Sequence, residues 1–128
     1  MFTSTLEAIC ADAGWRYDPA LGEVEVDLAD GRKQSVMVSE TTLDDGPYLR
    51  LVSVIGPSEA LDRQRSQAAL RLNASLCHGA FAIVGDDLAV LDLIPAIGDV
   101  TERLWASLAY VAKTADRYEQ VVFGTDQH

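Results

Sequence analysis

The segment Glu23–Leu28 restricts the fold more than any other part of the chain, because charged and apolar residues alternate along it without a break. Side chains of a β-strand point alternately to its two faces. Val24, Val26 and Leu28 therefore face one side, while the three carboxylates face the other. A strand with one wet face is typical of an antiparallel sheet, whereas strands of parallel sheets are buried on both faces. The segment predicts an antiparallel sheet that meets water on one side.

The remaining elements extend this sheet and add helices. Asp30-Gly31 is a strong hairpin signal after the first strand. Further strands are predicted at 34–40, 48–55, 81–84 and 88–94, and helices at 4–13, 58–76 and 99–119. The order is α-β-β-β-α-β-β-α, in which helices and strands do not alternate singly, so a doubly wound parallel sheet is disfavoured. We predict an α+β fold: a mostly antiparallel sheet with helices packed against it, in a single domain over 1–128 with a disordered tail at 124–128.

Capping residues mark the ends of the predicted helices. Ser4 and Glu7 have the spacing of a capping box. Asp99 and Glu102 form an acidic version of the same arrangement before the last helix. Asn73 is predicted to be a structural cap at the end of the middle helix, where its side chain bonds either the last helical carbonyls or the backbone of the following hairpin.

The charge balance restricts the partners. The 128 residues include 20 acidic and 10 basic side chains, for a formal charge of −10. We therefore expect no nucleic-acid binding, which needs a basic face, and no docking on an anionic membrane. No apolar run approaches the roughly 20 residues of a spanning helix, and no signal peptide is visible at the N-terminus. The cytoplasm is the expected compartment, with Cys10 and Cys77 reduced.

No catalytic, cofactor-binding or metal-binding motif stands out. Cys77-His78 joins a nucleophile and a base, but neighbouring residues do not face each other on a helix or a strand. Asp44-Asp45, and Asp86-Asp87 with Asp92, do not match a calcium loop and are explained as turn residues. No phosphate-binding glycine motif is present. We expect a non-catalytic protein with no cofactor and no metal. Trp15 and Trp105 are expected in the core, although Trp105 is also placed to contact a partner.

The second half of the chain carries an ordered set of short motifs. They are Leu70-Arg71-Leu72-Asn73, Phe81-Ala82-Ile83, Gly85-Asp86-Asp87-Leu88, Leu91-Asp92-Leu93 and Ala115-Asp116-Arg117-Tyr118. With this order and spacing, the chain resembles the type III secretion chaperone-like (Tir chaperone-like) fold, and more closely the YbjN-like bacterial proteins within it. The resemblance covers nearly the whole chain by element order and its second half by motif.

The resemblance implies a protein-binding, chaperone-like module that acts as a homodimer and holds an extended client segment. In such a module the second helix contributes to the dimer and apolar sheet positions contact the client. The implied dimer positions are Leu61, Gln64, Ala68 and Leu72, and the implied client contacts are Leu49 and Leu51. The alternative is a YbjN-like regulatory or adaptor protein with a folded partner and no link to secretion. A small enzyme with an unrecognised site is the third possibility.

Overall fold

The protein is described by a computed structural model over residues 2–122; the tail predicted at 124–128 lies outside this range. The helices are α1 (Phe2–Ala13), α2 (Arg63–Leu72) and α3 (Thr101–Val122). The strands are β1 (Arg16–Asp18), β2 (Glu23–Asp27), β3 (Lys33–Leu43), β4 (Gly46–Pro57), β5 (Ala80–Val84) and β6 (Asp87–Pro95). Three short 3₁₀ turns are η1 (Ala29–Gly31), η2 (Ser58–Ala60) and η3 (Asn73–Ser75).

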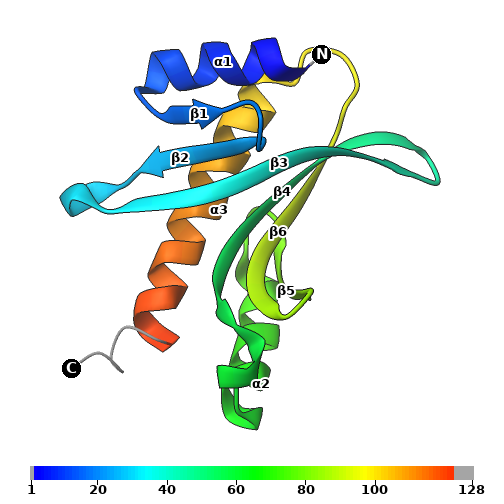
Figure 1. Ribbon diagram of the computed structural model, residues 1–128. Helices are drawn as coiled ribbons and strands as arrows, with labels where there is room; N and C mark the ends of the chain where they lie inside the picture. Colours follow the sequence, from blue (N-terminus) through cyan, green and yellow to red (C-terminus); the bar gives the residue numbers. More distant parts are fainter. Residues whose placement is uncertain (1, 123–128) are drawn as a thin grey trace.

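The six strands form one antiparallel sheet in the order β1-β2-β3-β4-β6-β5. Helix α3 crosses behind the sheet and contacts β2, β3, β4 and β6, as Figure 1 shows. Helix α1 packs against β1 and α3, and α2 contacts β5 at the opposite end of the sheet. The predicted α+β class and the mostly antiparallel sheet are confirmed.

The sheet has one strand more than predicted. The sequence pattern predicts no strand between the helix at 4–13 and Glu23, whereas Arg16–Asp18 pairs with Glu23–Glu25 as the edge strand β1. Three residues are too few to show a hydrophobic period, which is why the sequence pattern missed this strand. Gly22 closes the turn before β2 with a φ of 68°, and its carbonyl accepts a hydrogen bond from the N–H of Val38.

Helix α2 is shorter than the helix predicted over 58–76. Leu61 and Asp62 have extended backbones and separate the turn η2 from the helix. The Asp62 carboxylate accepts a hydrogen bond from the N–H of Arg65 and is the N-cap of α2, so the helix begins at Arg63 and not at residue 58. At its other end the helix tightens into η3. The structure therefore has a short turn and a shorter helix where the apolar pattern predicted one long helix, because Asp62 caps a new helix within that segment.

The capping residues predicted for α1 and α3 have different outcomes in the structure. Helix α1 already includes Phe2, so Ser4 lies inside its first turn and is not its N-cap. At the start of α3, the Asp99 carboxylate accepts hydrogen bonds from the N–H and the hydroxyl of Thr101, at 3.0 and 2.6 Å. These bonds lower the pKa of Asp99.

The core lies between α3 and one face of the sheet. Val24, Val36, Leu49 and Leu51 on this face have no exposed area. The residues of α3 that pack there without exposed area are Leu104, Ser107, Leu108, Val111, Ala112 and Ala115. Burying each of the larger side chains contributes about 1.5–3 kcal/mol to folding. The alternating pattern of β2 thus places its valines under the helix and its carboxylates on the other face.

Candidate interaction face

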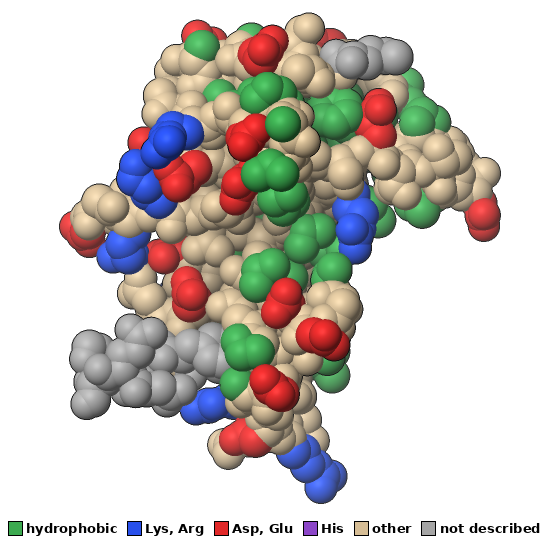
Figure 2. All heavy atoms as spheres, in the orientation of Figure 1, with side chains coloured by type: hydrophobic (Ala, Val, Ile, Leu, Met, Phe, Trp, Pro, Cys, Tyr) green, Lys and Arg blue, Asp and Glu red, His purple; other side chains and the backbone are tan. Residues whose placement is uncertain are grey.

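The second face of the sheet carries apolar side chains that α3 does not cover. We call the cluster Met37, Val52, Val54, Leu91 and Leu93 the open face. Met37, Val54 and Leu93 are 41%, 44% and 38% exposed. Figure 2 shows hydrophobic side chains in a column over the middle of the sheet. Because exposed apolar patches are where proteins bind partners, the open face is the candidate interaction site of this protein.

Strand register explains why these side chains gather. Residues directly opposite each other on neighbouring strands point to the same face of a sheet. One such row crosses all six strands, from acidic residues on β1 and β2 to apolar residues on the next four. Its members, in order, are Asp18, Glu23, Met37, Val52, Leu91 and Ala80. The next row on the same face of the sheet pairs Arg50 with Leu93. The apolar column is therefore built by register and comes from separate parts of the chain.

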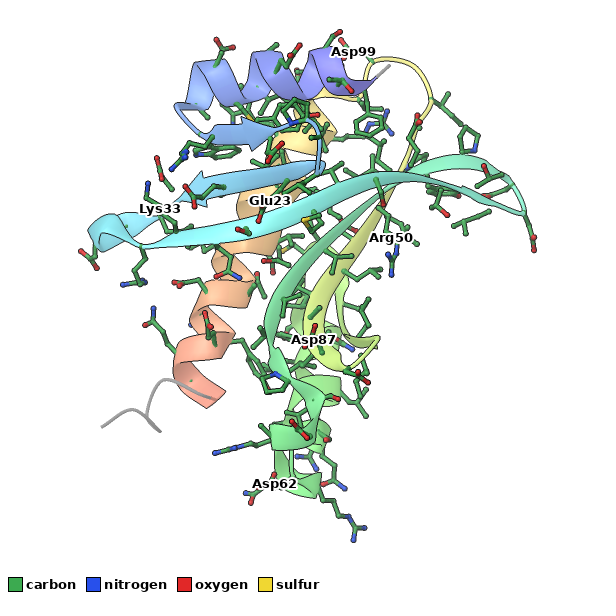
Figure 3. The ribbon with its side chains drawn as sticks, in the orientation of Figure 1. Glu23, Lys33, Arg50, Asp62, Asp87 and Asp99 are labelled. Carbon is green, nitrogen blue, oxygen red and sulfur yellow. The ribbon has the colours of Figure 1, made fainter. Side chains whose placement is uncertain are left out.

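Charged residues border the open face. Glu23 of β2 lies opposite Met37, Arg50 of β4 lies opposite Leu93, and Asp87 begins β6; all three are labelled in Figure 3. On the β2 side, Glu25 lies 3.7 Å from both Arg16 and Lys33, which balances part of the acidic charge there. An apolar centre with a charged rim is the usual composition of a protein interface.

The client contacts implied at Leu49 and Leu51 are wrong. Both side chains lie on the α3 face and have no exposed area. The sequence of β4 is apolar on both faces toward its end, so the pattern did not show which face the helix covers. The register resolves this, because Leu51 lies opposite Val38, a residue of the buried face, while Val52 lies opposite Met37.

The implied dimer positions on α2 have mixed environments. Leu61 packs partly against the core, and Ala68 is half-buried. Gln64 is exposed, and Leu72 is 41% exposed. The neighbouring Leu70 is 69% exposed. Two leucines therefore remain accessible at the end of this helix.

Helix α2 also differs from the rest of the protein in charge. Arg63, Arg65 and Arg71 lie on it, and no acidic residue lies within its bounds. In a chain of net charge −10, this helix is a local basic surface. Two copies that joined through α2 would bring arginines together.

Asn73 lies where α2 ends and reaches the edge strand β5. Its Oδ1 accepts a hydrogen bond from the N–H of Phe81 at 2.6 Å, and its Nδ2 donates to the carbonyl of Phe81 at 3.3 Å. The side chain of Asn73 could have bonded either the last carbonyls of the helix or the backbone of the following hairpin, and it bonds the hairpin. Phe81 itself packs on Tyr118 of α3, with ring centroids 4.5 Å apart.

His78 has an environment that sequence reasoning missed. Its Nδ1 lies 3.9 Å from Oδ2 of Asp92, and its ring packs on Tyr110. Oδ2 of Asp92 also accepts a hydrogen bond from the buried hydroxyl of Ser107 at 2.6 Å. These residues come from three separate segments, so no local spacing could have revealed them.

This cluster lacks the contacts of a nucleophilic site. In a Ser-His-Asp triad the histidine lies between hydroxyl and carboxylate, whereas here Ser107 donates directly to Asp92. The hydroxyl of Tyr110 accepts from the backbone N–H of Cys77, and within residues 2–122 no hydrogen bond joins the Cys77 thiol to His78. The bond of Tyr110 with Cys77 holds the loop before β5 against α3, and the bond of Ser107 with Asp92 ties β6 to the same helix.

The aspartate pairs noted in the sequence have structural contacts. Asp45 accepts a hydrogen bond from the hydroxyl of Tyr48 at 2.6 Å, and the carbonyl of Asp86 accepts from the N–H of Ser58. Among the residues that the structure describes, no three His, Cys, Asp or Glu side chains gather as metal ligands.

No family model and no curated protein matches the chain. The resemblance to YbjN-like proteins therefore stays a prediction. None of the helices within residues 2–122 combines the length and apolar character needed to cross a membrane.

Proposed function

We propose that this protein is a non-catalytic, chaperone-like module of the bacterial cytoplasm that holds an extended segment of a partner protein on its open face. The observation that carries the proposal is the column formed by Met37, Val54 and Leu93, which stays exposed on a folded sheet. Burying such side chains in a complex would recover free energy that the protein alone does not gain.

The chemistry of the border indicates what kind of segment fits. Of the three charged residues labelled at the border, Glu23 and Asp87 are acidic and Arg50 is basic, and the whole chain carries a net charge of −10. Opposite charges steer partners together and disfavour acidic competitors. An extended segment whose side chains alternate between faces presents apolar residues to the column on one face. We therefore propose a basic and apolar segment as the occupant.

Peptide binding tests this function. A fluorescein-labelled peptide in which leucine and lysine alternate is titrated with the protein, and its anisotropy is measured. We expect saturable binding that weakens as salt is added, because salt screens the exposed charges. The variant Met37→Ser/Leu93→Ser should bind about tenfold more weakly, since it loses apolar contact area.

Two controls make the result specific. Ile97→Ser removes an apolar side chain that is 64% exposed but lies in the loop after β6, and it should bind like the unchanged protein. A peptide in which leucine alternates with glutamate should bind much more weakly. Equal binding of both peptides, or an equal loss in the Ile97 variant, would contradict the proposal.

A homodimer is the second part of the proposed function. The exposed Leu70 and Leu72 at the end of α2 support it, because they are a surface that a second copy would bury. This surface shares no residue with the open face, so a dimer formed through α2 is compatible with partner binding at the open face.

A further inference from the structure

A groove of about 530 Å³ lies between α3, the end of β2 and the turn η1, away from the open face. Its apolar lining comes from Trp15, Val26, Leu28, Ala29 and Ala109. Small-molecule sites are typically a few hundred to about 1,000 Å³, mostly apolar, with a few polar groups that orient the ligand. The groove has this size and this composition.

Trp15 provides a large flat surface in this groove. It is half-buried and packs edge-on against Trp105, with ring centroids 6.3 Å apart and an angle of 63° between the rings. This contact fixes the orientation of the Trp15 ring. The part of the Trp15 ring that lines the groove suits an alkyl or aromatic body.

The same groove is lined by three basic residues, Arg32, Lys113 and Arg117. The chain has only 10 basic residues, so the groove is rich in positive charge for this protein. The acidic residues of the lining are already paired. Asp116 accepts from Nε of Arg32 at 3.0 Å and from Gln120 at 3.2 Å. Asp27 lies 3.5 Å from Nζ of Lys33.

Within residues 2–122, Lys113 and Arg117 have no such partner. Among the side chains that the structure describes, no carboxylate lies within 4.0 Å of either cation. They are four residues apart on α3 and both exposed. Like charges at this spacing destabilise a helix. An anion that bound between them would remove this repulsion.

We propose that this groove binds a small amphipathic anion, a carboxylate joined to an alkyl or aromatic body. The body would lie on Trp15 and Leu28, and the carboxylate would bind Lys113 and Arg117. The guanidinium of Arg117 suits a carboxylate because it donates two parallel hydrogen bonds. This site is independent of the proposed protein-binding function, since the two surfaces share no residue.

Octanoate and octan-1-ol are suitable probes because they share an alkyl chain and differ in charge. Binding is measured by calorimetry and by the NMR signal of the Trp15 indole N–H, which Trp105→Phe assigns because the chain has two tryptophans. We expect octanoate to bind at least about tenfold more tightly than octan-1-ol and to shift the Trp15 signal.

Two double variants give a charge-matched comparison. Lys113→Ala/Arg117→Ala should weaken octanoate binding about tenfold or more. Arg63→Ala/Arg71→Ala removes the same charge from exposed positions of α2 and should leave binding unchanged. All four residues are exposed, so both variants should fold.

Three results would overturn the proposal. One is equal affinity for octanoate and octan-1-ol, and another is equal octanoate binding by the two double variants. The third is a short apolar peptide with a free C-terminal carboxylate that displaces octanoate and binds more than about tenfold tighter. That result would assign the groove to a protein terminus in place of a small molecule.

Discussion

The side-chain amide of Asn73 pairs with the backbone of Phe81 as a neighbouring strand would, accepting from its N–H at 2.6 Å and donating to its carbonyl at 3.3 Å. Phe81 belongs to β5, which is the last strand of the sheet. An open sheet edge is a template for unwanted strand pairing. Asn73 provides hydrogen-bond partners for the N–H and carbonyl of Phe81 and thereby joins the end of α2 to the sheet.

We expect Asn73→Ala to lower the free energy of unfolding by about 1 kcal/mol, because two hydrogen bonds to β5 are lost. Urea unfolding measures the change. Asn73→Asp keeps the acceptor for the N–H of Phe81 but loses the donor, so its midpoint should lie between those of the alanine variant and the unchanged protein. An unaltered midpoint in Asn73→Ala would show that these bonds do not stabilise the fold.

Gly79 should tolerate alanine less well than Gly85. Both have a positive φ, 70° and 61°, which costs a residue with a Cβ about 1–2 kcal/mol. A Cβ on Gly79 would also clash with the backbone carbonyl of Leu91, whereas nothing lies within 4 Å of one on Gly85. Thermal unfolding of Gly79→Ala and Gly85→Ala compares them. Equal losses would show that the backbone near Leu91 relaxes.

We expect light scattering at high micromolar concentration to give twice the mass of one chain. Leu72→Asp should shift the protein toward the monomer, since it places a charge on the accessible end of α2. Leu21→Asp, at a loop position that is 60% exposed, is the matched control. Added salt should favour the dimer, because it screens repulsion between the arginines of α2. A monomer at all salt concentrations would contradict the prediction.

The pKa of Asp99 is lowered by its hydrogen bonds to Thr101. A carboxyl whose pKa is lower in the folded state adds stability above its unfolded pKa and loses it as the pH falls through the folded value. We therefore expect the urea midpoint of Asp99→Asn to fall less between pH near 7 and pH near 3 than that of the unchanged protein. Asp12→Asn, at an exposed position of α1, is the control. An equal fall of the urea midpoint in Asp99→Asn and in the unchanged protein would contradict this prediction.

The α+β class followed from local patterns. Alternation over Glu23–Leu28 and the turn at Asp30-Gly31 predict a half-buried antiparallel hairpin, and both strands form. Local patterns suffice there because strand periodicity and turn conformation depend on neighbouring residues. Strand β1 was missed because three residues are too few to show a period. The start of α2 was misplaced because the Asp62 cap begins the helix within a segment whose apolar pattern looks continuous.

The functional surfaces depended on the tertiary structure. Leu49 and Leu51 looked equivalent to Val52 in the sequence, and only the pairing with β3 and the position of α3 separate buried from exposed residues. The groove beside Trp15 and the contact of His78 with Asp92 join residues that are far apart in the chain.

The sequence by itself therefore determined the class of fold and the existence of one wet sheet face, since both arise from short-range periodicity. Which apolar residues occupy that face, and which cations line the groove, was decided only by strand register and by the packing of α3. Register and helix packing are set by contacts between distant segments, which a local pattern does not encode.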